Sequence, residues 1–367
     1  MNRFTADNEL IKKNGRGSVF EGCFPMYFTG SGVEISVKSS ELYVELDSDY
    51  ETYEPIVSVI IDGERILRFT PQKGVGKYLI FRAMDGNKPK HVRITKDVQA
   101  MPEDPKHKLI FRAFECDGSL EKLPEHKLKI EFIGDSITSG EGLIGPQSLE
   151  DWISYCFDSV NNYSNLISTE LDADYRVISQ SGWGVKCSWD NDPERTLPLI
   201  YEKVCGTCRA LKDTGFNPFG EYDFSWKPDF VLINLGTNDG GSYSQPEHKN
   251  PVTGETFKNR LLPDGKRDPE CVKRFEDALV DFLKMVRKHN PDSQIIWNYG
   301  ICSPYLERDI REAIDAYLSE TNDDKLSFLL IPQNTPEQVG ARWHPGKSAH
   351  RMMADMLIAK IKEIKKD

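Results

Sequence analysis

The chain has 367 residues, of which 38% are hydrophobic and 10% aromatic, and its formal net charge at pH 7 is −11. This length favours two domains, and the composition lies well outside that of disordered chains. The acidic balance, without a long basic run, argues against nucleic acid and anionic membrane surfaces as partners. A membrane-spanning helix is not expected either, because no stretch approaches the roughly 18 apolar residues that it needs.

Two features bear on the cellular compartment. Residues 1–8 lack the apolar core of a secretory signal, so the protein either stays in the cytoplasm or has lost its signal, and Met1 favours a cytoplasmic protein. The eight cysteines lack the spacing of a disulfide framework, and we expect free thiols. A zinc site at the close pair Cys205 and Cys208 would need two more ligands, so we predict neither a metal nor another cofactor.

Residues 1–125 have the pattern of an all-β domain. Apolar and polar residues alternate in short runs, and turn signals such as Asp62-Gly63 separate the runs. The series predicts a β-sandwich or jelly roll. The charged stretch 121–129, which contains Pro124, is the expected linker. Strands are expected at residues 33–37, 42–46, 57–61, 66–69, 78–81, 92–94 and 109–114.

Residues 126–367 change to alternating strands and helices. One helix should begin at Asp268-Pro269, a capping side chain followed by proline, and end at His289-Asn290-Pro291. A last helix is expected over residues 353–364. The predicted fold class is therefore α/β, with a three-layer domain that follows the β domain. Continuous apolar runs predict the strands of a buried parallel sheet at 130–133, 176–179, 230–235, 294–299 and 326–331.

Residues 134–138 read Gly-Asp-Ser-Ile-Thr and stand between a predicted strand and a glycine-rich turn. Ligands of open α/β folds bind at this end of the strands, which makes Ser136 the candidate nucleophile of a serine hydrolase. The Gly-x-Ser-x-Gly elbow of α/β-hydrolases is missing. Taken alone, Ser136 fits the N-cap of a helix better than a nucleophile.

Hydrolysis by a serine also needs a base and hydrogen-bond donors for the oxyanion. His344, in a turn between the last strand and the last helix, is the candidate base. The Asn238 side chain and the backbone N–H groups of Gly182 and Ser136 are the candidate oxyanion donors. Asn238 directly follows a buried strand, and Gly182 has no side chain to block an approach.

These blocks together resemble the SGNH (GDSL-type) hydrolases, whose four signature residues would be, in order, Ser136, Gly182, Asn238 and His344. The run Ile-Glu-Phe-Ile-Gly-Asp-Ser-Ile-Thr, preceded by a jelly-roll-like domain, is similar to carbohydrate esterase family 2. The resemblance covers nearly the whole chain. It implies an esterase that removes O-acetyl groups from plant-derived poly- or oligosaccharides of the xylan or mannan type.

One position departs from the broader SGNH pattern. Most members have an aspartate three residues before the histidine, whereas this chain has Ala341. Family 2 members are often Ser–His dyads in which a backbone carbonyl orients the imidazole, so the resemblance implies a dyad of Ser136 and His344. A carbonyl can fix the tautomer but stabilises an imidazolium less than a carboxylate would. If a carboxylate were required, Glu337 would be the first candidate.

Sugars are commonly held by aromatic stacking together with hydrogen bonds in a concave site. The candidate contacts are aromatic residues at predicted strand ends or loops on the active-site side. Each of them could equally fill the core or a domain interface. A small acyl pocket is implied only by the resemblance. The candidates are Trp183, Trp297, Tyr305 and Trp343.

The polar segment 240–268 directly follows the Asn238 block and contains three prolines. It is expected to form a lid, a contact in a homo-oligomer, or a solvated surface loop. Two other functions stay open at this point: a carbohydrate-binding protein with little turnover, and a serine esterase for other small acyl esters. The complete set of nucleophile, base and oxyanion donors favours an enzyme, because binding alone does not need such a set.

Overall fold

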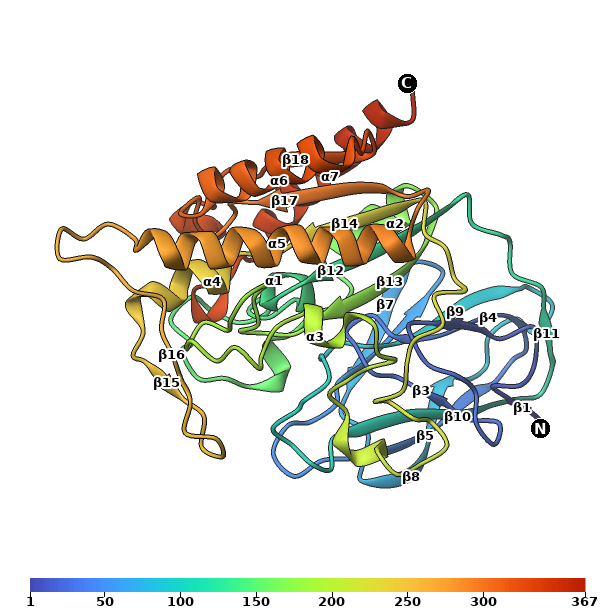
Figure 1. Ribbon diagram of the computed structural model, residues 1–367. Helices are drawn as coiled ribbons and strands as arrows, with labels where there is room; N and C mark the ends of the chain where they lie inside the picture. Colours follow the sequence, from blue (N-terminus) through green and yellow to red (C-terminus); the bar gives the residue numbers. More distant parts are fainter. Residues whose placement is uncertain (367) are drawn as a thin grey trace.

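The computed structural model describes residues 1–366, and Figure 1 shows two regions side by side. The strands from β1 (Asn2–Thr5) to β11 (Ser119–Glu121) form the part that we call the β-region. The elements from β12 (Leu128–Gly134) to α7 (Lys347–Ile364) form the α/β-region. Within the described residues, no helix has the length and apolar character needed to cross a bilayer.

The β-region consists of two antiparallel sheets that share an apolar core. The strands predicted from alternation are confirmed, because alternation sends every second side chain of a strand such as β5 into the core. The first sheet has the order β1, β10 (Lys108–Cys116), β5 (Leu42–Asp49), β8 (Gly74–Phe81), with β3 (Phe24–Pro25) on β10. The second has the order β11, β4 (Gly32–Lys38), β9 (Lys90–Lys96), β6 (Val57–Ile61), β7 (Glu64–Phe69), with β2 (Lys12–Asn14) on β4.

The pattern does not predict β1, β2, β3 and β11. These strands have two to four residues each, which is too short for an alternation to be recognised. They form by pairing along the longer strands β4 and β10. The expected linker is also shorter than predicted, since β11 ends at Glu121 and β12 begins at Leu128. A domain boundary at residue 125 stays a prediction.

The α/β-region is built on a parallel sheet of five strands, which confirms the five predicted runs. Strand β12 is the first strand of this region but lies between β13 and β14. The chain therefore adds β13 on one side of β12 and the later strands on the other. Such a switch point brings the loops after neighbouring strands together at the carboxyl edge of the sheet. The order is β13 (Ala173–Ser179), β12, β14 (Phe230–Asn234), β17 (Gln294–Tyr299) and β18 (Leu326–Leu330).

Helices cover both faces of this sheet (Figure 1). Helices α5 (Pro269–His289) and α6 (Glu307–Thr321) pack against one face, and α2 (Tyr163–Glu170) and α7 against the other. The predicted bounds of α5 are confirmed, and the Asp268 carboxylate accepts a hydrogen bond from the Glu270 N–H. The pattern does not predict α6, which begins with a charged turn and without a capping side chain. Single helical turns lie in the loops: α1 (Ser136–Ser139), α3 (Pro198–Tyr201) and α4 (Thr237–Gly241).

The segment 240–268 contains a short hairpin of β15 (His248–Lys249) and β16 (Thr256–Phe257). In Figure 1 this hairpin projects away from the sheets. At its base, the buried Asn259 donates a hydrogen bond to the Ser242 hydroxyl (2.8 Å) and thereby ties the end of the segment to the residues after α4. The segment is therefore a projecting arm with a fixed base.

Buried contacts connect the two regions. Tyr27, Phe28, Ala100 and Ile110 of the β-region belong to the same apolar core as α5 and α6. The β-region therefore packs against the α/β-region over a continuous apolar core.

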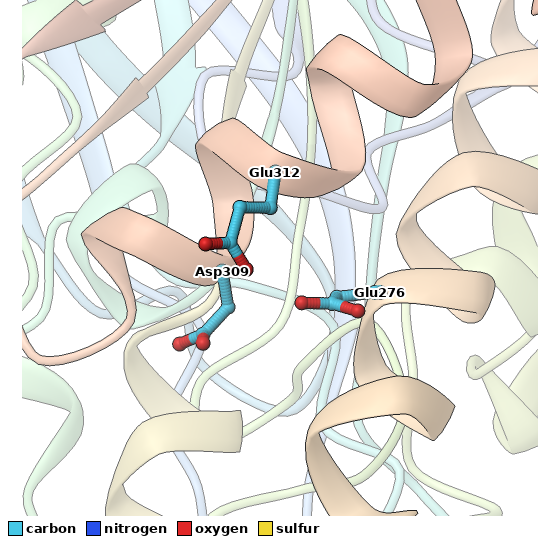
Figure 2. A group of neighbouring side chains, drawn as sticks. All are labelled: Glu276, Asp309 and Glu312. Atoms are coloured by element: carbon cyan, nitrogen blue, oxygen red, sulfur yellow. The ribbon is translucent and has the colours of Figure 1, made fainter. Parts of the chain in front are cut away.

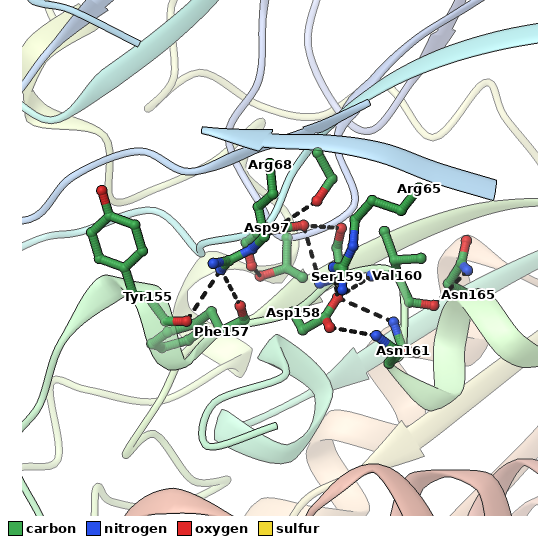
Figure 3. A network of polar contacts seen from close by, with 12 residues as sticks. Arg65, Arg68, Asp97, Tyr155, Phe157, Asp158, Ser159, Val160, Asn161 and Asn165 are labelled. Carbon is green, nitrogen blue, oxygen red and sulfur yellow. Dashed lines mark hydrogen bonds and ion pairs between the residues drawn. The ribbon is translucent and has the colours of Figure 1, made fainter. Parts of the chain in front are cut away.

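Figure 3 shows a polar network that crosses the same boundary. Arg65 of β7 donates to the Asp158 carboxylate (2.8 Å), and Arg68 of β7 donates to Asp97 (2.8 Å). The Ser159 hydroxyl donates to Asp97 as well (2.6 Å). The Asp158 N–H donates to the Gly140 carbonyl (3.2 Å), so this network reaches the turn that follows Ser136.

Candidate active site

The three loops at the switch point each carry one of the predicted residues. Ser136 is the first residue of α1, directly after β12, and Gly182 lies in the loop after β13. Asn238 is in α4, the turn after β14. Because β12 pairs with both β13 and β14, the structure brings these three loops to one edge of the sheet.

The turn around Ser136 is held by its neighbours. Asp135 is the N-cap of α1, and its carboxylate accepts a hydrogen bond from the Ile137 N–H (3.0 Å). The alternative that Ser136 is itself the cap is therefore wrong. The Ser136 carbonyl accepts a hydrogen bond from the Glu141 N–H (3.0 Å), and Gly140 ends the turn with φ +79°. The side chain of Ser136 therefore takes no part in capping or closing this turn.

Two backbone N–H groups at this edge lack acceptors. Among the described residues, neither the Ser136 nor the Gly182 N–H donates a hydrogen bond to the protein. Gly182 has φ +79°, a conformation that side chains disfavour, and a Cβ there would lie 2.9 Å from the Trp189 ring. Free N–H groups of this kind are suitable donors for a developing oxyanion.

Asn238 is held in place by two acceptors. Its Nδ2 donates to the Trp183 carbonyl (2.9 Å) and to the Asp135 carboxylate (3.2 Å). The next residue, Asp239, accepts hydrogen bonds from the backbone N–H groups of residues 185–187 at 2.7–3.2 Å. Burial raises the pKa of Asp239 despite these three donors. Through these bonds α4 fixes the loop that carries Gly182.

His344 lies where the sequence predicts it, in the turn before α7. Its Nδ1 lies 2.9 Å from the Arg342 carbonyl oxygen. A carbonyl can only accept, so Nδ1 carries the hydrogen and Nε2 keeps its lone pair. The carbonyl that the family resemblance implied in place of an aspartate is thus present, and Arg342 supplies it. Arg342 and Trp343 both have left-handed backbone conformations, with φ +54° and φ +61°.

The turn of His344 packs directly on the turn of Ser136. The Ala341 N–H donates to the Gly142 carbonyl (2.9 Å), and a Cβ at Gly142 would lie only 2.5 Å from the His344 Cβ. No hydrogen bond joins Ser136 Oγ and His344 in residues 1–366. Hydrogen bonds between catalytic groups are often long in unliganded sites and tighten when a substrate is bound.

One carboxylate beside His344 is missed by the sequence reasoning. Glu141 is buried, accepts a hydrogen bond from Arg342 Nε (2.8 Å) and places Oε2 3.9 Å from His344 Nε2. Burial raises its pKa, but His344, the Ser181 hydroxyl and Arg342 outweigh burial and hold the pKa below its usual range. Glu337, the carboxylate suspected from the sequence, is exposed and accepts a hydrogen bond from Thr335 Oγ1.

The aromatic candidates divide into buried and exposed residues. Trp183 is 7% exposed in the loop after β13 and stays a predicted contact. Trp297 is fully buried in β17, so it cannot be a stacking platform. A strand buried on both faces has no side chain free for a ligand. Trp343 is 66% exposed next to His344, and Tyr305 is 46% exposed, with Arg267 over its ring.

A further exposed tryptophan is missed by the sequence reasoning. Trp189 is 50% exposed, lies against Gly182, and donates its backbone N–H to the Gly182 carbonyl (2.9 Å). The motif search does not identify it, since the loop between Gly182 and Trp189 brings the ring back beside the glycine. Exposed rings thus flank both Gly182 and His344.

Figure 2 shows three carboxylates grouped between α5 and α6, those of Glu276, Asp309 and Glu312. Arg267 forms an ion pair with Asp309, so a cation of the protein already neutralises part of this charge. Burial, followed by the two neighbouring carboxylates, raises the pKa of Glu276. The cluster contains none of the predicted site residues.

Cys205 and Cys208, the one close pair of cysteines, are buried free thiols. Cys205 Sγ lies 3.3 Å from the Thr207 hydroxyl, and Cys208 Sγ donates to the His107 carbonyl. Burial raises the pKa of both thiols and thereby keeps them protonated. Both cysteines belong to the apolar core that includes α5 and α6.

Fold and site together define the class of SGNH-type hydrolases, with the four signature residues on loops at one sheet edge. The chain belongs to the GDSL-like lipase/acylhydrolase family, whose model matches residues 132–352. An acetyl xylan esterase (Est2A) of known structure, from the rumen bacterium Butyrivibrio proteoclasticus, is 40% identical over 99% of both chains, with a TM-score of 0.96.

Two curated relatives extend this comparison. The cellulase/esterase CelE of Acetivibrio thermocellus is 25% identical over 97% of this chain, and an acetylxylan esterase/glucomannan deacetylase of Cellvibrio japonicus is 27% identical over 70% of it. The chain spans 40% and 65% of their respective lengths. Solved family two carbohydrate esterases share its fold. The resemblance to carbohydrate esterase family 2 is thus confirmed.

Proposed function

We propose that the protein is a serine esterase that removes O-acetyl groups from plant-derived poly- or oligosaccharides of the xylan or mannan type. The observation that carries the chemistry is the imidazole of His344. The Arg342 carbonyl lies 2.9 Å from Nδ1, so the neutral imidazole carries its hydrogen on Nδ1 and offers Nε2 as the base, and its turn packs on the turn of Ser136. The names of the relatives support the acetylated polysaccharide as the substrate class.

In the proposed reaction Ser136 and His344 act as a dyad. His344 Nε2 takes the proton of the Ser136 hydroxyl as Oγ attacks the acetyl carbonyl. The oxyanion receives hydrogen bonds from the N–H groups of Ser136 and Gly182 and from Asn238 Nδ2. Nε2 then protonates the leaving sugar oxygen, which leaves an acetyl group on Ser136. Nε2 then deprotonates a water molecule, which attacks the acetyl-enzyme; the ester bond to Oγ breaks, Nε2 returns the proton to Oγ, and acetate leaves.

Asn238 must turn its amide slightly to take part. Its Nδ2 already donates to the Trp183 carbonyl and, at the longer distance of 3.2 Å, to Asp135. The longer bond is the one we expect to be exchanged for the oxyanion. The bond to the Trp183 carbonyl keeps the amide in position during this exchange.

For substrate binding we propose the two exposed tryptophans that flank the catalytic residues. Trp343 lies beside His344, and Trp189 lies beside Gly182. Aromatic faces of this kind stack on the apolar faces of sugar rings and leave the ester to the dyad. Tyr305 stays a predicted contact. Replacing Trp343 with alanine should raise KM for oligosaccharides much more than for a small acetyl ester.

The decisive experiment follows acetate release by NMR from mixed acetylated xylan and glucomannan oligosaccharides, which reports the sugar and the hydroxyl together. The parent should release acetate, and the Ser136→Ala variant should be slower by at least about 10³-fold while it keeps its thermal unfolding temperature. Equal rates for parent and variant would refute the proposed nucleophile. Binding of the oligosaccharides without acetate release by the parent would instead identify a carbohydrate-binding protein.

Three further points are proposed with the function. The two antiparallel sheets support a jelly-roll topology for the β-region. Eight free cysteines, most of them buried, support a reducing cytoplasmic location.

The projecting arm of residues 240–268 is the surface that we propose for contact with a second copy in a homo-oligomer, which sedimentation of an arm-deleted variant would test.

A further inference from the structure

We infer that Glu141 is a positioning residue for the proposed esterase reaction, because its buried carboxylate stabilises the positive charge that His344 acquires when it takes the proton of Ser136. The inference rests on the proposed function and deepens it. It concerns the fifth residue after Ser136, to which no motif assigns a role.

Glu141 lies between the turn that carries Ser136 and the turn that carries His344. Its backbone N–H donates to the carbonyl of Ser136 (3.0 Å), so it moves with the nucleophile. Its side chain reaches across to the opposite turn, where one oxygen accepts from Arg342 Nε (2.8 Å) and the other lies 3.9 Å from His344 Nε2. A single residue thus connects the nucleophile, the base and the residue whose carbonyl orients the base.

The position of the carboxylate suits the charged form of His344. Nε2 is the nitrogen that receives the proton of the serine, so positive charge appears on the side that faces Glu141. The carbonyl on Nδ1 carries only a partial charge and stabilises an imidazolium less than a carboxylate does. Glu141 therefore supplies, from the Nε2 side, the negative charge that an aspartate in place of Ala341 would supply from the Nδ1 side.

Charged and titratable groups face Glu141 from each packed element. Arg342 and His344 come from the turn before α7, and the Ser181 hydroxyl comes from the loop after β13. Cys156 and Asp135 are further neighbours, and burial, more than Glu141, raises the pKa of both. The Glu141 carboxylate faces Arg342 with one oxygen and His344 with the other, so it contacts two positive charges once His344 is protonated.

A purely structural role, in which Glu141 only anchors Arg342, makes a different prediction. An anchor would affect folding and the order of the turn, but not the pH at which the base becomes protonated. An electrostatic role moves this pH in a direction set by charge. Loss of a negative charge makes the imidazole less basic, whereas loss of a positive charge makes it more basic.

The test is the pH profile of kcat/KM for a small acetyl ester, measured with the full chain. We expect Glu141→Gln to move the acid limb of the profile down by roughly one pH unit and to lower kcat about tenfold, with KM within about twofold. Glu141→Asp, which keeps the charge, should restore part of kcat and of the shift. Arg342→Gln should move the acid limb upward. As the matched control, the exposed Glu337→Gln should leave the profile unchanged.

Opposite shifts for the Glu141 and Arg342 variants support the inference. An unmoved acid limb in a folded Glu141→Gln variant overturns it, and so do shifts of the same sign in the two variants. If Glu141→Gln does not fold, Glu141→Asp and Arg342→Gln still decide between the two roles. Failure of the proposed function would look different, since the parent itself would then release no acetate, or Ser136→Ala would release it as fast.

Discussion

The β-region and the α/β-region use buried polar side chains in different ways. In the α/β-region they surround Ser136 and His344 on the loops at the sheet edge. In the β-region some of them reach across the boundary to these same loops, whereas others, such as Asn14 with Glu34, bond within the region. Gln99 accepts hydrogen bonds from the Ser139 hydroxyl (2.8 Å) and the Ser181 N–H (2.7 Å), so one buried amide of the β-region connects the nucleophile loop and the Gly182 loop.

The difference indicates that contacts from the β-region help to position the loops of the candidate site. The reacting groups lie on loops, and loops are positioned by whatever they pack against. Here the packing partner is the β-region, through Gln99, through the ion pair of Arg65 with Asp158, through hydrogen bonds from Arg68 to the carbonyls of residues 155 and 157, and through a common apolar core. Side chains near the chemistry should therefore affect kcat most, and side chains across the boundary should affect kcat and stability together.

The largest effect is expected for the base. Replacing His344 with alanine should lower kcat by at least about 10³-fold, because the proposed reaction uses its Nε2 to take the Ser136 proton and to protonate the leaving group. The unfolding temperature should change little, since the imidazole is partly exposed and makes one hydrogen bond to the backbone. Steady-state kinetics and calorimetry would check this. A strong loss of stability with only a modest loss of kcat would contradict this prediction, because side chains near the chemistry would then affect stability more than rate.

The next effect concerns Asn238. Its replacement with alanine should lower kcat by roughly 10²–10³-fold, the usual loss for one oxyanion donor, with a small effect on KM. Removal of the amide also leaves the Trp183 carbonyl without its donor. Single-turnover acetylation rates would separate the chemical step from product release. A loss confined to KM would place Asn238 in binding instead.

A smaller effect is expected across the boundary. Replacing Gln99 with methionine keeps the volume but leaves the Ser181 N–H and the Ser139 hydroxyl without this acceptor. We expect a loss of about 1–3 kcal/mol in the free energy of unfolding and a moderate loss in kcat. Denaturant titration and kinetics on the same preparation measure both. The exposed Gln72→Met of the β-region is the control, and it should match the parent in both.

The smallest effect is a dependence of stability on pH. Burial raises the pKa of Asp135 from 3.8 to about 7, although the Ile137 N–H opposes the shift. The folded state thus holds this proton more tightly than the unfolded chain, so the stability it contributes is complete below pH 3.8 and is lost as the pH rises through 7.

The size of this dependence can be measured against a variant that does not titrate. Between pH 6 and 8 the parent should lose about 1 kcal/mol relative to Asp135→Asn, which still caps α1. Denaturant titrations of both proteins at several pH values would show it. Parallel curves for the two proteins would mean that Asp135 titrates normally and that the nucleophile turn is wetter than the structure indicates.

The strands and the longest helix are predictable from sequence because their signals are local. Alternation identifies β5, and the Asp268-Pro269 start identifies α5. Helix α6 is not predicted, because its first turn is charged and lacks a capping side chain. It is recognised only from its packing against α5 in the structure. The short strands at the edges depend on partners far along the chain in the same way.

The same distinction applies to the site. Ser136, Gly182 and Asn238 can be predicted because each lies in a motif shortly after a strand, and His344 because its motif directly precedes the last helix. Glu141 cannot be recognised in that way, because its role depends on a turn that lies about 200 positions later in the chain. Trp297 is assigned wrongly because a position near a strand end says nothing about which face is buried, and here both faces are.

The backbone around His344 has a consequence for selection. Arg342 and Trp343 are two successive non-glycine residues with positive φ, each of which costs roughly 1 kcal/mol relative to glycine. A population selected only for heat resistance should therefore accumulate glycine or asparagine at these two positions. Its members would outlast the parent at high temperature while losing the exposed ring beside the base and the cation beside Glu141. Where natural sequences keep bulky residues at these two positions, selection for turnover has outweighed selection for stability.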